Sequence, residues 1–509
     1  MAIPGFFKKK DIAIYILCIL SFFAALFYNE LSLRKAPAGV IRSGGTIITN
    51  DDASYLNPPR NYLENNVWGE DYGASKVGRF IRPPGYGLLY LPFLKVFGAP
   101  ASVTALKFFQ YLLFAFSVYW FWFILSSLVK NSRLALACTF IYGCSPFVIG
   151  FLSYTLTEGI TPALLLYYVY LLFKARAALS ERGKNGYYFF AALVFSFLFI
   201  VRPVLGVFIL LLPAFLLADF KGLFFAKRIL KLTAFTAVAL SFMLVWQVRN
   251  YSIAGRYVGL HPIYYADGNT IYRAPFKAYW EFAGCWAEKG DVGFSYMVPM
   301  WDAAIKGDTS IGHITFALSQ MPAEVVSFYG KARLTAVFRD YQSAVLYQKP
   351  YYDKGLAMPM ELSAEEQKVV AGFGELVSEY KSEFPLQYHV IAPLRVLRLL
   401  AFNSNLSLYM FQVTLRGKLW MEALRVLCCL LHVLCFLAVL SSIFLFRRNR
   451  LLSIVFGWMP FLYLFYLCYF QRGVEERYTL PLLPLLMIGL ACLFSLWGRT
   501  TKSVDLSHK

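Results

Sequence analysis

The chain has 509 residues, of which 59% are hydrophobic, 18% aromatic and only 15% charged, and its formal net charge is +20. This balance excludes an ordinary soluble domain and indicates a polytopic α-helical membrane protein. Membrane topology and attraction to anionic headgroups account for the basic excess. No basic cluster is large enough to favour nucleic acid as a partner.

Membrane-spanning helices need about 20 mainly apolar residues, and about ten stretches come near that length. They lie at 12–28, 105–129, 134–152, 160–178, 187–201, 203–218, 230–248, 420–446, 451–470 and 479–497. The apolar run 187–218 is broken only by Arg202-Pro203. This break predicts two short spans that meet at an outer turn, because proline cannot continue a helix and arginine prefers the interface.

Basic residues in the short loops set the orientation. They cluster before the first span and after the second, fourth, sixth, eighth and last spans, and all these clusters fall on one side. Both termini are therefore predicted to be cytosolic. Of nine cysteines, only Cys285 lies outside the spans, so the large outer segment uses no internal disulfide. The sequence thus favours a multi-pass protein of a bacterial inner membrane, with its active site on the outer face.

The chain is predicted to have three parts. Residues 1–248 form an N-terminal transmembrane half, whose first outer loop, 29–104, is expected to be catalytic. Residues 249–418 form a mixed extracytoplasmic domain, and residues 419–509 form the C-terminal transmembrane helices.

Two stretches of the predicted outer domain have helical character. Ile391 to Phe411 is apolar enough to be mistaken for a span. A span there would move Arg447, Arg448 and Arg450 to the outside, so we expect an interfacial helix instead. Glu361 to Phe384 is acidic and amphipathic, and is predicted to be an α-helix.

Three acids lie at the predicted outer mouth of the bundle. Asp51 and Asp52 follow the first span, and Glu158 precedes the fourth. A carboxylate there can accept a proton from a hydroxyl or amine, and the repulsion between two adjacent acids can raise one pKa. Helix capping explains Asp51 and Asp52 equally well, and an interfacial position explains Glu158.

Five arginines fall at outer ends of spans. Each alone is more often an interface anchor, but together they could form a ring of guanidinium groups suited to phosphate. The five are Arg82, Arg202, Arg249, Arg472 and Arg477, of which we expect two or three to bind the phosphate of a donor. The expected partner of Glu158 is Arg82 or Arg202.

The motifs that carry these residues resemble those of polyprenyl-phosphate-sugar-dependent glycosyltransferases of the GT-C fold. This superfamily includes the protein O-mannosyltransferases and the lipid A aminoarabinose transferase. The matching stretches are Asn50-Asp51-Asp52-Ala53-Ser54-Tyr55-Leu56, Arg82-Pro83-Pro84-Gly85-Tyr86, Leu156-Thr157-Glu158, Val201-Arg202-Pro203, Trp246-Gln247-Val248-Arg249-Asn250-Tyr251 and Glu476-Arg477-Tyr478-Thr479-Leu480-Pro481.

The resemblance covers nearly the whole chain in order and placement. It implies a GT-C bundle, a polyprenyl-phosphate sugar as donor, and substrate-binding roles for Tyr55, Tyr86 and Tyr478. The family often has Asp-Glu where this chain has Asp51-Asp52, so the match to the catalytic acid stays open between the two. The spacing to Tyr55 favours Asp52.

The residues also suit this reaction when the family resemblance is set aside. A sugar on polyprenyl phosphate already has a good leaving group, so the enzyme needs a base for the acceptor and cations for the departing phosphate. Asp52 or Asp51 would be the base, and one displacement would invert the anomeric centre. The acceptor could be a glycan, lipid or protein. No cofactor is certain, and a divalent metal remains compatible with the acids.

Two other functions compete with this interpretation. A flippase or other transporter of lipid-linked glycans is disfavoured, because the spans carry few charges and the chain shows no inverted repeats. An O-antigen ligase or polymerase also has a large external loop, but would not need the acid pair of the first outer loop.

Overall fold

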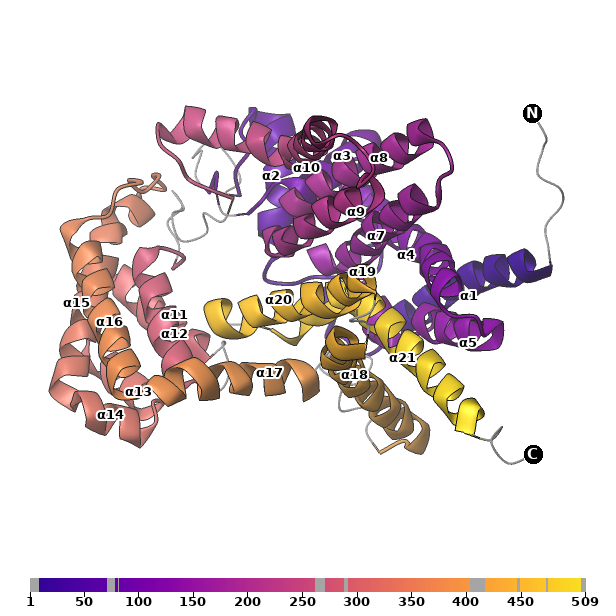
Figure 1. Ribbon diagram of the computed structural model, residues 1–509. Helices are drawn as coiled ribbons and strands as arrows, with labels where there is room; N and C mark the ends of the chain where they lie inside the picture. The colour runs from indigo at the N-terminus through magenta and orange to yellow at the C-terminus, as the bar shows by residue number, and fades with distance from the viewer. Residues whose placement is uncertain are drawn as a thin grey trace.

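The computed structural model describes residues 9–70, 78–80, 82–260, 271–287, 292–402, 417–445, 449–472 and 475–504. These residues are mostly helical (Figure 1). The N-terminal half contains α1 (Lys9–Leu33), η1 (Ala38–Val40), β1 (Ile41–Arg42), β2 (Thr46–Ile47), α2 (Asp52–Asn65), α3 (Gly85–Phe97), α4 (Ala101–Leu128), α5 (Ser132–Gly143), α6 (Pro146–Ile149), η2 (Thr157–Gly159), α7 (Thr161–Ala177), α8 (Glu181–Val201), η3 (Pro203–Leu210), α9 (Leu211–Asp219) and α10 (Phe225–Ala254).

The rest of the chain forms a separate lobe and then returns to the bundle. The lobe contains α11 (Ala274–Trp286), α12 (Val292–Lys306), α13 (Ile311–Ser319), α14 (Ala323–Tyr329), α15 (Lys331–Asp353) and α16 (Ala364–Glu383). The returning part contains η5 (Gln387–Ile391), α17 (Ala392–Phe402), α18 (Leu419–Leu445), α19 (Arg450–Ser453), η8 (Ile454–Trp458), α20 (Met459–Phe465), η9 (Tyr466–Gln471), η10 (Glu476–Leu482) and α21 (Leu483–Val504).

Eight helical segments among the described residues are long and apolar enough to cross a membrane. They are Ile12–Leu33, Ala101–Leu128, Ser132–Ile149, Glu181–Val201, Phe225–Ala254, Leu419–Ile443, Arg450–Gln471 and Arg477–Ser495. The chain is therefore a polytopic helical membrane protein. The other two predicted spans correspond to α7, of 17 residues, and to the shorter apolar helix Pro203–Asp219. A total of ten thus stays a prediction.

The break predicted in the run 187–218 is present. α8 ends at Val201, Arg202 is extended, and Pro203 opens η3 because a proline at the first helical position loses no hydrogen bond. Arg202 is thereby held at the junction of two helices. This junction borders the candidate functional site.

The lobe has its own aromatic core, separate from the core of the bundle. Phe276, Tyr279, Phe282 and Phe373 are buried in it. The sequence predicts a mixed domain at 249–418, whereas the described residues of this segment form helices and no strand, and α10 extends into it as far as Ala254. The predicted helix at Glu361 to Phe384 is confirmed as α16, which Ser363 and Glu366 begin with a capping box.

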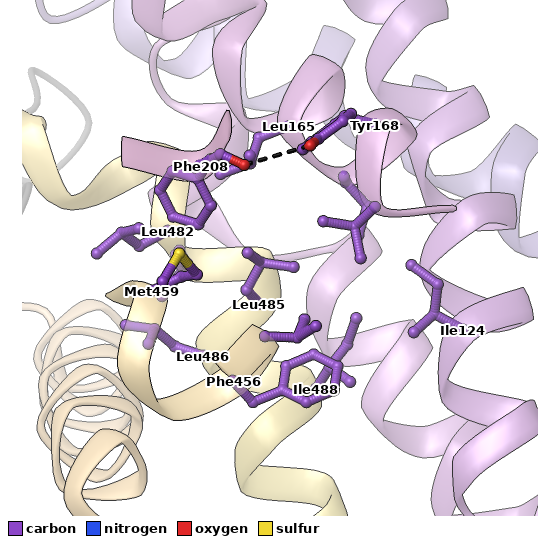
Figure 2. Close-up of a cluster of buried hydrophobic side chains, with 14 of the residues drawn as sticks. Ile124, Leu165, Tyr168, Phe208, Phe456, Met459, Leu482, Leu485, Leu486 and Ile488 are labelled. Carbon is purple, nitrogen blue, oxygen red and sulfur yellow. Dashed lines mark hydrogen bonds between the residues drawn. The ribbon is translucent and has the colours of Figure 1, made fainter. Parts of the chain in front are cut away.

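The bundle core joins the two transmembrane parts of the chain. Figure 2 shows Tyr168 of α7 donating to the carbonyl of Phe208 at 3.2 Å, with Met459 of α20 and Leu485 of α21 packed nearby. Burial of such side chains stabilises by about 1.5–3 kcal/mol each in water, although association of helices inside a bilayer relies on van der Waals packing and interhelical hydrogen bonds. Helices from the two ends of the sequence therefore form one bundle.

The lobe lies at one end of this bundle. α1 begins and α21 ends on the side away from the lobe (Figure 1). α17 runs from the lobe back to the bundle and covers the first part of the predicted interfacial stretch. Residues 403–411 of that stretch lie outside the described residues, as do Arg447 and Arg448.

Candidate functional site

A small hairpin lies in the loop between the first two membrane-spanning helices. β1 pairs antiparallel with β2, and the turn between them contains Gly44 and Gly45 at φ +94° and +71°, a conformation that favours glycine. Lys107 of α4 donates from Nζ to their carbonyls at 2.8 and 2.9 Å. The turn is thereby held against α4, which fixes Arg42 at the end of β1.

Asp52, the first residue of α2, is buried among donors. Arg42 Nη2 donates to its Oδ2 at 2.6 Å, and the Thr49 hydroxyl donates to Oδ1 at 3.1 Å. The Thr155 hydroxyl also donates to Oδ1. Thr155 lies there because its neighbour Tyr154 forms a parallel bridge with β2. Both oxygens of Asp52 are thus occupied, and the carboxylate ties the hairpin to α2.

Asp51 stands at the N-cap position of α2, but its side chain makes no capping hydrogen bond. Arg82 Nη2 donates to its Oδ1 at 2.6 Å, and Arg477 Nη2 donates to its Oδ2 at 2.7 Å. Arg82 Nε also donates to Ser54 at 3.2 Å. The Asp51 side chain is 23% exposed, against 8% for Asp52. Asp51 is therefore the more accessible of the two acids, and its side chain pairs with cations instead of capping the helix.

Glu158 and Arg202 form a buried ion pair. Arg202 Nη1 lies 2.7 Å from Glu158 Oε1, and the two side chains are 10% and 3% exposed. Thr157 accepts a hydrogen bond from Arg202 at 3.0 Å and donates to Glu158 Oε2 at 3.2 Å. The guanidinium also lies 4.9 Å above the Tyr478 ring. The predicted pairing of Glu158 with Arg202 is thus present.

Close packing of two helix ends brings Arg82 towards this pair. A Cβ on Gly85, the first residue of α3, would lie 2.5 Å from the backbone nitrogen of Val201 at the end of α8. Only glycine allows such an approach without displacing backbone. Arg82 precedes α3 and Arg202 follows α8, so this contact draws the two arginines to one place.

Arg477 connects the two acid sites. Besides its bond to Asp51, its Nε lies 3.7 Å from Glu158 Oε1 and 2.6 Å from Glu475 Oε2, and its Nη2 donates to Glu475 Oε1 at 3.0 Å. We call the resulting set the arginine–carboxylate cluster; its members are Asp51, Glu158, Glu475, Arg82, Arg202 and Arg477.

The cluster keeps Glu158 and Arg202 ionised. Burial raises the pKa of the Glu158 carboxyl, but Arg202 and Arg477 outweigh burial, and the pKa is lowered to about 2. Burial lowers the pKa of the Arg202 guanidinium, but the charge and hydrogen bond of Glu158, together with Tyr463 and Tyr478, outweigh burial, and the pKa is raised. Burial raises the pKa of Tyr272 at the start of the lobe. The positive charge of Arg82 lowers this pKa, and the negative charge of Asp51 raises it. The lobe therefore begins beside the cluster.

The other two predicted arginines make different contacts. Arg249 donates to the carbonyls of Trp68 and Arg79, each at 2.9 Å, and so holds the loop between the first two membrane-spanning helices against α10. Arg472 donates to the carbonyl of Tyr388 at 3.0 Å and stacks 3.7 Å from the centre of that ring. Arg472 Nη1 also donates to the carbonyl of Gly284 in α11 at 3.4 Å, so its contacts fasten the lobe to the end of η9.

Two of the three predicted tyrosines lie against arginines of the cluster, and the third packs against one of these tyrosines. Tyr55 lies 5.5 Å below the Arg82 guanidinium and packs edge-to-face against Tyr86. The Tyr86 hydroxyl donates to Gln110 at 2.9 Å and the side chain is fully buried. Tyr478 lies under Arg202. These contacts orient the arginines through cation–π interactions.

Sequence reasoning missed Arg42, Thr155 and Glu475. The first and last could have been found, since each is close in sequence to the acid or arginine that it contacts; Thr155 depends on a tertiary contact. In the part of the chain that the structure describes, no group of three or more histidine, cysteine, aspartate or glutamate side chains could hold a metal ion. The carboxylates of the cluster face guanidinium groups.

An apolar groove of about 400 Å³ lies between α17, α18 and α20 with η9. Its described lining is apolar apart from Arg398 and includes Leu394, Phe402, Leu437 and Phe465. These four side chains are exposed. The volume falls within the range of small-molecule sites, about 300–1,000 Å³. α17 also contacts η10, which contains Arg477, so the groove lies one helix away from the cluster.

No protein-family profile and no curated protein matches the chain. Among solved structures, it is similar to ArnT from Cupriavidus metallidurans bound to undecaprenyl phosphate, with 11% identity, a TM-score of 0.34, and coverage of 96% of this chain and 79% of that one. The apo state of the same protein gives 12% identity, a TM-score of 0.34, and coverage of 92% and 77%.

Proposed function

We propose that the protein is an integral membrane glycosyltransferase of the GT-C type, which transfers a sugar from a polyprenyl-phosphate donor to an acceptor at the outer face of the membrane. The observation that carries this proposal is the arginine–carboxylate cluster. It combines three guanidinium groups with a partly accessible carboxylate, Asp51, and an apolar groove lies one helix away. Phosphate binding and proton acceptance are the two tasks that this reaction requires.

The reaction is a single displacement. The acceptor oxygen or nitrogen attacks the anomeric carbon, the bond from that carbon to the phosphate oxygen breaks, and its electron pair leaves with the polyprenyl phosphate. Arg82 and Arg477 hold the developing negative charge, while Asp51 takes the acceptor's proton. Attack from the face opposite the leaving group inverts the anomeric centre.

Asp51 is the better candidate for the base, although the spacing to Tyr55 favours Asp52. Asp52 is nearly buried, with both oxygens held by Arg42, Thr49 and Thr155. Each oxygen of Asp51 instead faces one arginine of the cluster. A donor phosphate that draws Arg477 or Arg82 to itself would release an Asp51 oxygen to accept the proton. In this mechanism Asp52 positions the start of α2.

The prenyl chain of the donor and the acceptor can also be placed on the structure. The prenyl chain would lie along the groove lined by Leu394, Leu437 and Phe465, because its isoprene units are apolar and the groove is open. The acceptor would approach from the lobe, whose Tyr272 interacts electrostatically with Arg82 and Asp51. Arg202 and Glu158 would keep Arg477 in place.

Release of free polyprenyl phosphate by purified protein tests the proposal. The protein in vesicles is given radiolabelled polyprenyl-phosphate sugars, one sugar class at a time, with an envelope extract as acceptor. We expect release with at least one donor, and its loss in Arg82→Ala and Arg477→Ala. Arg249→Ala is the matched control, because Arg249 contacts backbone carbonyls of the first loop.

Movement of an intact lipid-linked sugar across the vesicle membrane without release would instead identify a transporter. Failure of both release and transport with every donor class, in protein that keeps its helical content, would exclude the proposal. Mass spectrometry of the envelope of a deletion strain would then supply candidate donors and acceptors.

A further inference from the structure

We propose that Glu475 is an internal competitor for the donor phosphate. Its carboxylate holds Arg477 until a phosphate displaces it, and it returns to Arg477 as the polyprenyl phosphate product leaves. This inference rests on the proposed function and concerns the same site. It assigns to Glu475 a role in the choice and release of ligands.

The contact between Glu475 and Arg477 combines one hydrogen bond with one ionic contact. Arg477 Nη2 donates to one Glu475 oxygen at 3.0 Å, and Nε lies 2.6 Å from the other without forming a hydrogen bond. A guanidinium binds carboxylate and phosphate oxygens with the same N–H groups, and pairs best where two of them donate in parallel. A phosphate can therefore replace this carboxylate without moving Arg477.

Glu475 is the most easily displaced acid of the cluster. Its side chain is 53% exposed, against 23% for Asp51 and 3% for Glu158. A displaced Glu475 can turn to water at little cost. Displacement of Glu158 would leave a buried charge without its partner, which is strongly unfavourable.

The charge balance makes displacement necessary. Three guanidinium groups face three carboxylates in the cluster, so a phosphate that added to the intact set would meet no surplus positive charge. Departure of Glu475 leaves one positive charge over, which matches the single negative charge of a phosphodiester donor. Arg477 is the guanidinium that becomes available.

The same carboxylate favours release of the product. Cleavage converts the phosphodiester into a phosphomonoester, whose charge is about −1.5 to −2 at pH 7. The product is thus held more strongly by the arginines than the donor was. A glutamate tethered two residues from Arg477 acts at high local concentration and competes for the guanidinium as the product leaves.

Binding of a purified polyprenyl monophosphate in detergent micelles tests the proposal. Glu475→Gln removes the charge and keeps the size, so the Kd should fall by about two- to fivefold, the range expected for loss of a half-exposed ion pair. The gain should be smaller for a polyprenyl methyl phosphodiester and absent for the neutral polyprenol. Product inhibition of transfer should strengthen by a similar factor.

Glu379→Gln is the matched control. Glu379 pairs with Arg333 in the lobe and its side chain is 35% exposed, so the variant removes the same charge from another surface pair. Its Kd should stay at the wild-type value. Glu475→Asp keeps the charge but shortens the reach, and should bind the monophosphate with intermediate affinity, which gives a second reading if the glutamine variant does not fold.

Two results would overturn the inference: an unchanged Kd for the monophosphate in Glu475→Gln, or an equal gain for the polyprenol. Both are separable from failure of the proposed function. If the wild type binds the monophosphate and Arg477→Ala weakens that binding, the proposed function stands whatever Glu475 does. If the wild type and Arg477→Ala bind it equally, the phosphate site itself is wrong.

Discussion

The buried pair of Glu158 and Arg202 can be examined by a double-mutant cycle. Arg202→Met replaces the guanidinium by an apolar chain and removes the 2.7 Å partner of Glu158. Glu158→Gln keeps the shape of the acid but leaves Arg202 with the Thr157 hydroxyl at 3.0 Å and the Tyr478 ring at 4.9 Å. The double variant removes both charges at once.

The contacts of the pair determine how much unfolding free energy each variant should lose. Removing one partner of a buried ion pair costs about 3–5 kcal/mol. For Arg202→Met we expect the lower end, about 3 kcal/mol, because Arg477 Nε still lies 3.7 Å from Glu158. For Glu158→Gln we expect about 2 kcal/mol, since the amide oxygen can still accept a hydrogen bond. The double variant should lose about 2 kcal/mol less than the sum of the singles.

The assay is the free energy of unfolding from titration with SDS in mixed micelles. The control cycle uses Arg333→Met and Glu379→Gln, because these two side chains form an ion pair in which both are well exposed, at 43% and 35%. Its coupling should stay below about 1 kcal/mol. Single losses at Glu158 and Arg202 that add to within about 0.5 kcal/mol would refute the reasoning, because such residues would not act as a coupled pair.

The remaining predictions concern pH, the base and two packing contacts. The folded pKa of Glu158, about 2, is below the unfolded value of about 4.3, so the stability that its ionised form contributes is present above pH 4.3 and is lost as pH falls towards 2. The difference in unfolding free energy between wild type and Glu158→Gln should shrink over that window, and a constant difference would contradict this. Asp51→Asn should lower turnover about 10²–10⁴-fold with little change in donor KM, measured by release of polyprenyl phosphate; near-normal turnover would exclude Asp51 as the base. Arg472→Ala removes the stack on Tyr388 and the bonds to the lobe, so limited proteolysis of the native protein should cut the junction near η5 faster, while an unchanged rate would show that other contacts hold the lobe. Gly85→Ala places a Cβ 2.5 Å from a backbone nitrogen of α8 and should lower the unfolding free energy by about 1–3 kcal/mol; an unchanged SDS midpoint would contradict that contact.

Much of the bundle is predictable because the hydrophobicity of a span is a local property. Arg202-Pro203 ends α8 where the sequence predicts a break, since proline disrupts a helix wherever it occurs in an interior. The character of the lobe was harder to predict. Its helices bury an aromatic core against one another, and segments such as α13 and α14, of 9 and 7 residues, are too short to show a clear helical period.

The sequence predicts most residues of the site, but it does not predict which of them contact one another. Arg82 and Arg249 look alike in sequence, each at the outer end of an apolar stretch. The first reaches Asp51, whereas the second donates to backbone carbonyls of the first loop. This difference depends on packing between distant segments, which spacing along the chain does not contain. Likewise Asp52 looks like the base in sequence, but the hairpin and Thr155 enclose its oxygens.

The bond between Asp51 and Arg477 spans 426 residues, and this separation has a consequence for biogenesis. Synthesis proceeds at about 5–20 residues per second, so the N-terminal half waits on the order of a minute before Arg477 leaves the ribosome. During that time Asp51 already has Arg82 and Glu158 already has Arg202 within the same half. These early ion pairs neutralise each acid until the last helix has been synthesised. The nascent half can therefore insert without an isolated buried charge, and the cluster is completed only when the C-terminal helices arrive.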